Sequence, residues 1–479
     1  MKVLATESSV IRPSAWLKSM GADPIEILGA NCTFAAGSLP HCGVQIPLES
    51  ANKISQKNAD QDGGPLYQLV VGTSPSASDV LFSGYLSGEK GKVSKVGGVL
   101  STGVDLIHPA RDLDETRMFA PEVHCGGIQD YTYTFHNQSV AGGPIGSKIS
   151  QNSYYSGKGG SLAKQIIEAV SFVLEEVVKV SQDANGSAVL GSVEKSQNLL
   201  KGLLFSEASL RPTISAKLTQ SINDFLRAQM SASFMSMRSC WDILVSIFAN
   251  FGMFLNCMGD GKITIEADVA GFESPEGNYL GPEYITDFEL SSRIQRNVRQ
   301  VTLVTDNILP ADIASGLSGS AQKPACLASY PLNPTEPGGI VCYGLPRWLA
   351  PFNQHQSADG VVTVNEVLAL QRAFAQSVYY KERNKFRTML VSGPLAPLVS
   401  VGTVAMVSPY PNIKALSGQG ADFANKTYIG YCYQINHMID RAGGTWITSF
   451  IFRNVSDGAS GETITSDPVL DGVKARTWQ

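Results

Sequence analysis

Four segments between residues 386 and 455 alternate between apolar and polar residues in the manner of β-strands. They are residues 387–392, 399–407, 427–439 and 445–455. Alternation with a period of two gives a strand two distinct faces, and the glycines of 440–444 permit the positive φ of a tight hairpin turn. Four strands of this kind leave open edges unless they close or find neighbours. The pattern therefore predicts a small antiparallel β-barrel.

The last two strands of this region have clearly different faces. The residues predicted to share a face of the final strand are Trp446, Thr448, Phe450 and Phe452, and those of the strand before it are Tyr431, Tyr433, Ile435, His437 and Ile439. We expect the face with Trp446 and the two phenylalanines to fill the barrel, because large apolar side chains are most often buried.

Residues 1–137 are also predicted to be β-rich, with strands at 66–71, 80–86 and 97–106 and shorter apolar pieces within 29–46. Residues 82–85 (FSGY) resemble residues 428–431 (YIGY), and each set lies in a predicted strand that precedes a glycine-containing turn and another strand. Two interpretations of this echo stay open. It is either a chance match or a sign of a second copy of the C-terminal barrel.

The middle of the chain has a different pattern. Apolar residues recur at helical spacing in three stripes, at 162–180, 214–226 and 241–251. Residues 253–257 and 262–265 flank Gly-Asp-Gly and predict a hairpin. A strand is predicted at 299–305 with Val301 and Leu303 on one face, residues 306–360 are predicted to be irregular, and Thr363 and Glu366 form a capping box that starts a helix.

The predicted fold class is α+β and β-rich, with two small antiparallel β-barrels and a helical or mixed middle domain. The predicted divisions are an N-terminal barrel-like domain (1–137), a linker (138–160), a helical domain (161–252), a mixed middle domain with a long loop and a helix (253–385), the C-terminal barrel (386–456) and a polar tail (457–479).

Composition limits the function classes. The 479 residues have a formal net charge of -5, which gives no basic footprint for tight nucleic-acid binding. Residues 1–21 have no apolar run of signal-peptide length, so we expect folding in a cytoplasm. The apolar stretch 240–258 is interrupted by Asp242, Asn250 and Asn256, which favours a core helix over membrane insertion. The eight cysteines have no C-x-x-C spacing, and we expect free, mostly buried thiols.

No catalytic signature is present. The sequence has no H-E-x-x-H and no G-x-S-x-G, and the glycine-rich stretch 142–148 lacks the Gly-Lys-Ser/Thr ending of a phosphate-binding loop. His41-Cys42 and His124-Cys125 are adjacent residues, which point to opposite faces of a strand and do not chelate one metal as a pair. His437 is interpreted as a structural or interface histidine. We therefore predict no catalytic, cofactor-binding or metal-binding residue, no cofactor and no enzyme activity.

Four stretches of the C-terminal region form a distinctive pattern: residues 393–402 (GPLAPLVSVG), 428–431 (YIGY), 435–440 (INHMID) and 445–448 (TWIT). With these stretches the region resembles the baseplate or tail hub proteins of tailed bacteriophages, which are related to the hub part of type VI secretion spikes. The resemblance sets expectations for the two barrels predicted above, as tube-like hub barrels, and for residues 1–137, as an N-terminal hub domain. Residues 293–304 and 240–265 also look like hub segments. Gly402 is offset from the position of the Pro-Gly pair of that family, and the helical region 160–235 is longer than the family pattern.

This resemblance implies a structural protein of the virion, located at the tail tip or baseplate and assembled in the host cytoplasm. Its expected form is a homotrimer with two similar barrels per subunit. Six barrels form a pseudo-sixfold ring that joins the sixfold tail tube to the threefold central spike and lets DNA pass without specific binding. The expected partners are the tail tube protein, the central spike, the tape-measure protein and the baseplate wedge or tail-tip proteins.

Three other functions are left open by the sequence. A virion-associated cell-wall or polysaccharide hydrolase needs a carboxylate pair, for which residues 112–115 and 175–176 supply acids. A secreted spike or effector carrier is disfavoured because few residues follow 455. A sugar-binding module is kept open by Tyr431, Tyr433 and Trp446.

Overall fold

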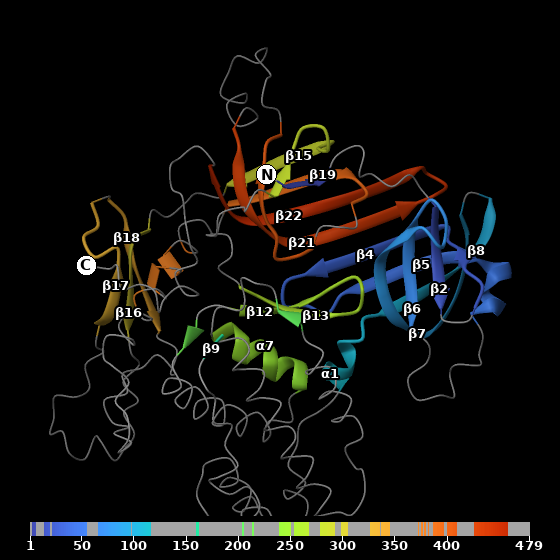
Figure 1. Cartoon of the computed structure of the whole chain (residues 1–479), viewed down its shortest axis with the longest axis horizontal. Helices are drawn as coiled ribbons and strands as arrows, with labels where there is room; N and C mark the ends of the chain where they lie inside the picture. The colour runs from blue at the N-terminus through green and yellow to red at the C-terminus, as the bar shows by residue number, and fades with distance from the viewer. Residues whose placement is uncertain are drawn as a thin grey trace, which may run out of the picture.

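The protein is rich in β-strands, which form a large, mainly antiparallel sheet system (Figure 1). The computed structural model describes residues 2–5, 14–19, 22–54, 66–96, 98–115, 160–161, 204–205, 213–214, 239–250, 253–267, 278–292, 298–304, 326–335, 337–344, 387–396, 400–409 and 426–457, together with the single residues 372, 375, 376, 378, 379 and 382. Within them, a 14-stranded sheet contains most of the chain's strands. The prediction of a β-rich protein is confirmed.

Five strands near the C-terminal end are paired in one continuous order, and we call them the C-terminal group. In spatial order they are β15 (Asp287–Ser292), β19 (Arg387–Pro394), β22 (Thr445–Asp457), β21 (Tyr428–Asp440) and β20 (Val404–Val407), each antiparallel to the next. Three of the four strands predicted in 386–455 are confirmed closely. The second begins later than predicted, because Gly402 lies in a turn with φ 94° and the strand starts after it.

Five strands near the N-terminus form a second set, the N-terminal group. In spatial order they are β4 (Gly29–Ala35), β5 (His41–Pro47), β8 (Val99–Ile107), β7 (Ser78–Val96) and β6 (Tyr67–Gly72), again all antiparallel. The strands predicted at 66–71, 80–86 and 97–106 are confirmed. When the five strands of each group are numbered in chain order, both groups have the same spatial order, 1-2-5-4-3.

Short strands extend both groups. Beyond β6 lie β2 (Ser14–Ser19) and β3 (Ile25–Glu26). Beyond β20 lie β14 (Asn278–Leu280) and β1 (Lys2–Ala5), both paired in parallel. A 3-10 helix, η2 (Leu48–Lys53), follows β5.

The last hairpins of the two groups consist of equivalent strands, and their registers differ by two residues beyond the irregularities of β7 between Leu86 and Val93. The hairpin from Phe82 to Ile107 is as long as that from Tyr428 to Arg453, and the strand partners Tyr85↔Ile107 correspond to Tyr431↔Arg453. The turn glycines at equivalent positions, Gly98 and Gly444, both have positive φ, at 87° and 69°. The FSGY and YIGY segments therefore occupy equivalent positions relative to the last strand of each group, on β7 and β21.

Gly84 in the FSGY segment and Gly430 in the YIGY segment are required for the same structural reason. A Cβ at Gly84 would lie 2.4 Å from the carbonyl oxygen of Ile107, and one at Gly430 would lie 2.9 Å from the Cβ of Phe452. Both contacts are made with the next strand of the hairpin, so both positions exclude a side chain.

In each group, a short segment before the first strand hydrogen-bonds to residues from both sides of the extended strand order; the segments are 27–28 and 280–286. The amide of Ile27 donates to Ala15 on β2 (3.0 Å), and the next amide, of Leu28, donates to Gln45 on β5 (2.8 Å). In the C-terminal group, Ser408 donates to Leu280 after β20 (3.0 Å), while Thr286 donates to Ser392 on β19 (2.8 Å).

The predicted core face of the final strand is confirmed. Thr448, Phe450 and Phe452 are fully buried and Trp446 packs against the core, whereas Ile447 on the opposite face is 37% exposed. The predicted face of β21 is confirmed for most of its residues. Tyr433 differs, because the register shifts between Cys432 and Gln434 and leaves Tyr433 as an extra residue in the strand.

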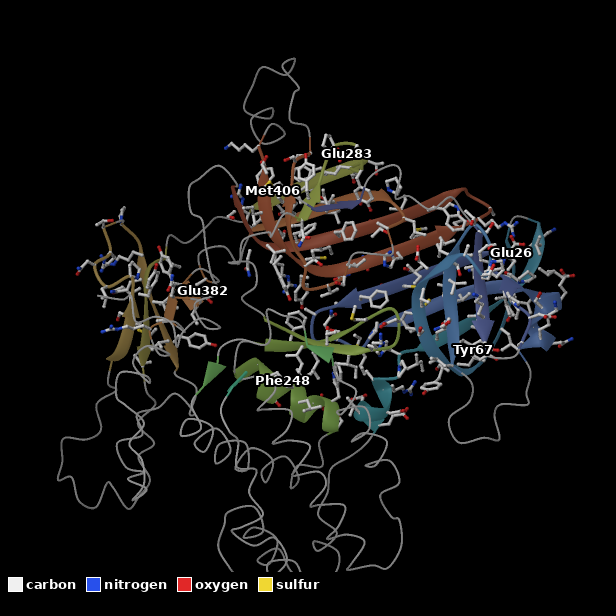
Figure 2. All side chains as sticks on the ribbon, in the orientation of Figure 1. Glu26, Tyr67, Phe248, Glu283, Glu382 and Met406 are labelled. Carbon is white, nitrogen blue, oxygen red and sulfur yellow. The ribbon has the colours of Figure 1, made fainter. Side chains whose placement is uncertain are left out.

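The middle of the chain contributes a helix and a hairpin beneath the two groups. The helix α7 (Cys240–Asn250) is shorter than the apolar stretch that predicts it, and the predicted hairpin follows as β12 (Met253–Cys257) and β13 (Ile263–Ala267). Phe248 on α7 is fully buried (Figure 2). A short helix, α1 (Arg111–Glu115), lies beside α7 (Figure 1).

The prediction that 306–360 is irregular is wrong in part. The predicted strand at 299–305 is β16 (Val298–Val304), with Val301 and Leu303 fully buried, and it pairs with two strands from that stretch, β17 (Cys326–Tyr330) and β18 (Gly339–Gly344). The central strand β16 offers backbone hydrogen-bond partners on both its edges. β17 and β18 form strands by pairing with it, although prolines and glycines are frequent in the stretch that contains them.

Other predictions lie largely outside the described residues. These are the stripes at 162–180 and 214–226, the linker and the polar tail. Between residues 138 and 238, the structure describes only the short strands β9 (Gly160–Ser161), β10 (Leu204–Phe205) and β11 (Thr213–Ile214), so Ile214 is in a strand and not in the predicted helix. In the part of the chain that the structure describes, none of the helices is long and apolar enough to cross a membrane.

Candidate functional site: the junction between the two strand groups

The two groups are joined edge to edge within one chain by strands β21 and β4. Their antiparallel register runs from Gln434↔Ala35 to Asp440↔Gly29 (Figure 1). The ladder continues at both ends, where Ala36 donates to Tyr433 (3.0 Å) and Arg441 donates to Leu28 (3.0 Å). The fourth strand of the C-terminal group thus pairs with the first strand of the N-terminal group.

His437 lies at the centre of this junction. Its ring is edge-on to Phe34 of β4, with centroids 6.0 Å apart, and its Nδ1 lies 2.9 Å from the hydroxyl oxygen of Thr448. That hydroxyl accepts a hydrogen bond from the amide of Ala396 (2.9 Å), so its own hydrogen can be donated to Nδ1. Burial lowers the pKa of His437 to about 3, which keeps the ring neutral at neutral pH. The interpretation of His437 as a structural or interface histidine is confirmed.

Charged side chains complete the junction at its surface. Arg441 lies 2.8 Å from the carboxylate of Glu26, and both side chains are about half exposed, so solvent screens this ion pair. The guanidinium of Arg453 lies 3.3 Å from the centroid of the Tyr433 ring. The extra residue of β21 is thereby covered by a cation–π contact.

The β12–β13 hairpin contacts both groups and holds them together from one side. On the N-terminal group, Gly37 donates to Leu255 (3.1 Å). On the C-terminal group, Asn256 donates through its side-chain amide to the carbonyl of Val401 (3.0 Å), and Phe254 packs edge-on against Tyr431. The hairpin, which belongs to the middle of the chain, therefore contacts both groups and fixes their positions relative to each other.

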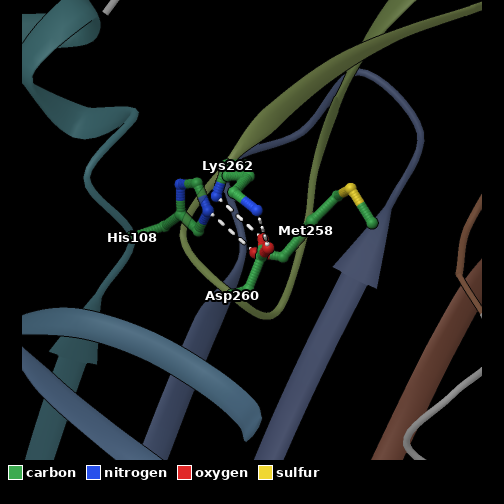
Figure 3. Close-up of polar contacts among 4 residues, drawn as sticks. All are labelled: His108, Met258, Asp260 and Lys262. Atoms are coloured by element: carbon green, nitrogen blue, oxygen red, sulfur yellow. Dashed lines mark hydrogen bonds and ion pairs between the residues drawn. The ribbon is translucent and has the colours of Figure 1, made fainter. Parts of the chain in front are cut away.

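The turn of this hairpin is held by His108 (Figure 3). His108 Nε2 lies 3.0 Å from the carbonyl oxygen of Met258, and its Nδ1 accepts from the amide of Ala110 (3.1 Å), so Nε2 is the donor. Burial lowers the pKa of His108 to about 4, against the smaller raising effects of the Met258 bond and the Asp260 charge. Lys262 and Asp260 form an ion pair at 2.9 Å on the exposed side of the turn.

We expect Gly259→Ala to destabilise the protein by about 1–3 kcal/mol, since overpacking costs this much when the obstacle is rigid. A Cβ at Gly259 would lie 2.5 Å from the carbonyl oxygen of Leu81 in β7, which is backbone and cannot turn aside. Chemical denaturation measures the effect. Gly103→Ala on β8 is the matched control, because a Cβ there meets nothing within 4 Å. Equal losses in the two variants would contradict the close contact between hairpin and strand.

The sequence prediction that His41 and Cys42 do not form a chelate agrees with their placement. His41 is exposed and lies 3.6 Å from Asp105, while Cys42 is buried on the other face of β5. His124 and Cys125 lie outside the described residues. In the described ranges, no group of three His, Cys, Asp or Glu side chains could hold a metal ion.

One contact was missed from the sequence. Cys32 on β4 and Cys42 on β5 are directly opposite each other, with their sulfur atoms 2.7 Å apart. Burial, followed by the hydrogen bond and charge of Cys32, raises the pKa of the Cys42 thiol well above its usual value, which disfavours the Cys42 thiolate. The expectation of free, mostly buried thiols is confirmed for the five cysteines whose side chains the structure describes, Cys32, Cys42, Cys257, Cys342 and Cys432, of which only Cys342 is exposed. Ten-residue spacing is no motif, and only the strand register brings the two together.

The aromatic residues that left a sugar-binding module open are packed inside the protein. Tyr431 is fully buried, Tyr433 lies under Arg453 and Trp446 packs against the core. The acids at 112–115 belong to α1, in which Arg111 and Glu115 pair at 2.5 Å. The glycine-rich stretch 142–148 and the acids at 175–176 lie outside the described residues.

Comparison with known proteins identifies structural neighbours and no sequence relatives. No family model matches the chain, and no curated protein matches it. The solved structure of a tail protein from Neisseria meningitidis MC58 is similar, with a TM-score of 0.47, 10% identity and coverage of 96% of this chain and 99% of that chain. This neighbour is described as a tail protein.

Two further structures belong to the same classes. The prophage MuSo2 43 kDa tail protein from Shewanella oneidensis matches with a TM-score of 0.44 and 9% identity, over 92% of this chain and 96% of that chain. The E. coli c3393 protein, described as a component of the type VI secretion system, matches with a TM-score of 0.37 and 9% identity, over 94% of this chain and 78% of that chain. Phage tail proteins and type VI spike-like proteins are also the classes that the sequence resembles.

Proposed function

We propose that the protein is the structural hub of a phage tail tip or baseplate, without catalytic, cofactor-binding or metal-binding residues. In this proposal each strand group is one small barrel, and three copies of the chain form a ring of six barrels. The ring joins a sixfold tail tube to a threefold central spike and leaves a channel for DNA.

The observation that carries the proposal is the junction between two groups of equal strand order. A protein that places two equivalent units side by side in one chain can repeat the same arrangement around an axis. The segment of Ile27 and Leu28 bonds to both β2 and β5, and the segment from Leu280 to Thr286 bonds to both Ser408 and β19. These links support the interpretation of each group as a closed unit.

The charge of the chain fits a channel that DNA crosses. A formal net charge of -5 repels phosphates weakly and gives no basic surface on which a passing strand would be held. We also propose, from the resemblance, that the tail tube, spike, tape-measure and wedge or tail-tip proteins are its partners in the virion, and that assembly takes place in the host cytoplasm. The division of the chain into hub, linker, helical and middle domains belongs to the same proposal.

The oligomeric state tests the proposal directly. We expect sedimentation equilibrium or mass photometry of the full chain to show a species of three 51.2 kDa chains, alone or with its spike protein. A protein that stays monomeric in both conditions would exclude the ring.

A further inference from the structure

The chain has two strand edges that correspond to the two partners of the internal junction. In that junction, the second half of β21 pairs with β4, the first strand of the N-terminal group. The equivalent of β21 is β7, and the equivalent of β4 is β15. Among the described strands, residues 85–96 of β7 pair only with β8, and β15 pairs only with β19.

These two edges lie on opposite sides of the internal junction (Figure 1). They therefore cannot be joined in the way that β21 and β4 are within one copy. A copy of the chain that offers its β15 edge can instead meet the β7 edge of the next copy, which is a head-to-tail contact. Such a contact also removes the exposed backbone donors and acceptors of both edges.

We infer that β7 of one copy pairs antiparallel with β15 of the next copy, as β21 pairs with β4 within the chain. This inference rests on the proposed function, because the ring supplies the second copy. It adds the strands, the orientation and the register that make the contact between subunits.

The register follows from equivalent pairs in the two groups. Met438 faces Ile447 in its own hairpin and Asn31 across the junction. In the N-terminal hairpin, the position of Ile447 is taken by Ser101, whose partner on β7 is Ser94.

The same procedure identifies the residue on β15. Cys42 on β5 and Met389 on β19 are equivalent, because their partners on the next strand, Leu106 and Phe452, are equivalent buried residues. Cys32 is opposite Cys42 and Leu290 is opposite Met389, so Cys32 and Leu290 are equivalent as well. The position before Cys32, which is Asn31, then corresponds to Glu289. Ser94 of one copy is therefore opposite Glu289 of the next.

The side chains at these edges suit each other. Val93 near the end of β7 and Leu100 at the start of β8 are 56% and 54% exposed, which is unusual for apolar residues on a paired hairpin. In the inferred register, Val93 lies opposite Leu290 and Lys95 lies opposite Phe288, and both of these β15 side chains are half-buried. Pairing the edges therefore covers apolar surface on this face of the sheet.

Disulfide trapping tests the register. Directly opposite residues of antiparallel strands have Cα atoms about 4.5–5.5 Å apart, within the range of a disulfide. We expect the full-length double variant Ser94→Cys with Glu289→Cys, oxidised with diamide, to give covalent species of two and three chains on a non-reducing gel. The single variants control for the native cysteines, including the exposed Cys342.

A matched control keeps the chemistry and changes only the register. Ser94→Cys with Asp287→Cys places the second thiol two residues along the same exposed edge, so we expect about tenfold less cross-linking. Equal cross-linking of the two double variants, or none in either while mass photometry still shows three chains, would overturn the strand pairing and leave the ring intact. A purely monomeric wild-type chain would overturn the ring itself.

Discussion

Phe450→Ala is expected to lower the free energy of unfolding by about 3–5 kcal/mol, as is usual for truncating a buried phenylalanine. Phe450 is fully buried on the core face of β22. Its ring centroid lies 6.1 Å from that of Tyr284 and 6.1 Å from that of Phe452, so the truncation leaves a cavity between large side chains that cannot all move in. Urea denaturation followed by tryptophan fluorescence measures the loss.

Ile447→Ala is the matched control for this variant. Ile447 lies on the same strand but on the opposite face and is 37% exposed, so its truncation is expected to cost less than about 1 kcal/mol. A loss at Phe450 no larger than that at Ile447 would show that the face with Phe450 is not the core of the C-terminal group.

Acidification from pH 7 to pH 4.5 is expected to lower stability by about 2–3 kcal/mol for each of His437 and His108. Burial lowers their pKa values to about 3 and about 4, while a histidine in the unfolded chain binds a proton near pH 6.5. Below pH 6.5 the unfolded state therefore binds more protons than the folded state. The stabilisation is complete above that pH and is lost as the pH falls toward the folded-state pKa values.

The contribution of one histidine is measured as a difference between variants. The difference in unfolding free energy between pH 7 and pH 4.5 should be smaller by about 2–3 kcal/mol in His437→Gln than in the wild type. His41→Gln should retain the full difference, because that side chain is 62% exposed. An unchanged pH dependence in His437→Gln would mean that the ring is solvated and not buried in the junction.

The sequence predicts the strands and faces of the two hairpins well because these depend on local alternation. Thr448, Phe450 and Phe452 repeat with the strand period, and the turn glycine at Gly444 marks the reversal. The match between the FSGY and YIGY segments leaves chance and a second copy open in the sequence, and in the structure both segments carry a glycine that packs against the neighbouring strand. In these two hairpins, the residues adjacent in the sequence determine whether a side chain is buried or exposed.

Sequence reasoning fails where the partner is distant along the chain. Nothing local to β15 indicates that it pairs with β19, and the stretch containing β17 and β18 forms strands only because β16 is available to both. The junction itself has the same origin. Residues 29–35 and 434–440 are separated by most of the chain, and their register follows from the packing of Phe34 and His437.

A cryo-electron microscopy reconstruction of the assembled protein, calculated without imposed symmetry, tests the central claim most directly. The account predicts a ring of three chains in which six similar β-units alternate between N-terminal and C-terminal groups. Neighbouring units should meet in two ways, through β21 with β4 inside a chain and through β7 with β15 between chains. A monomer, or an assembly in which the two groups do not alternate around one axis, would contradict it.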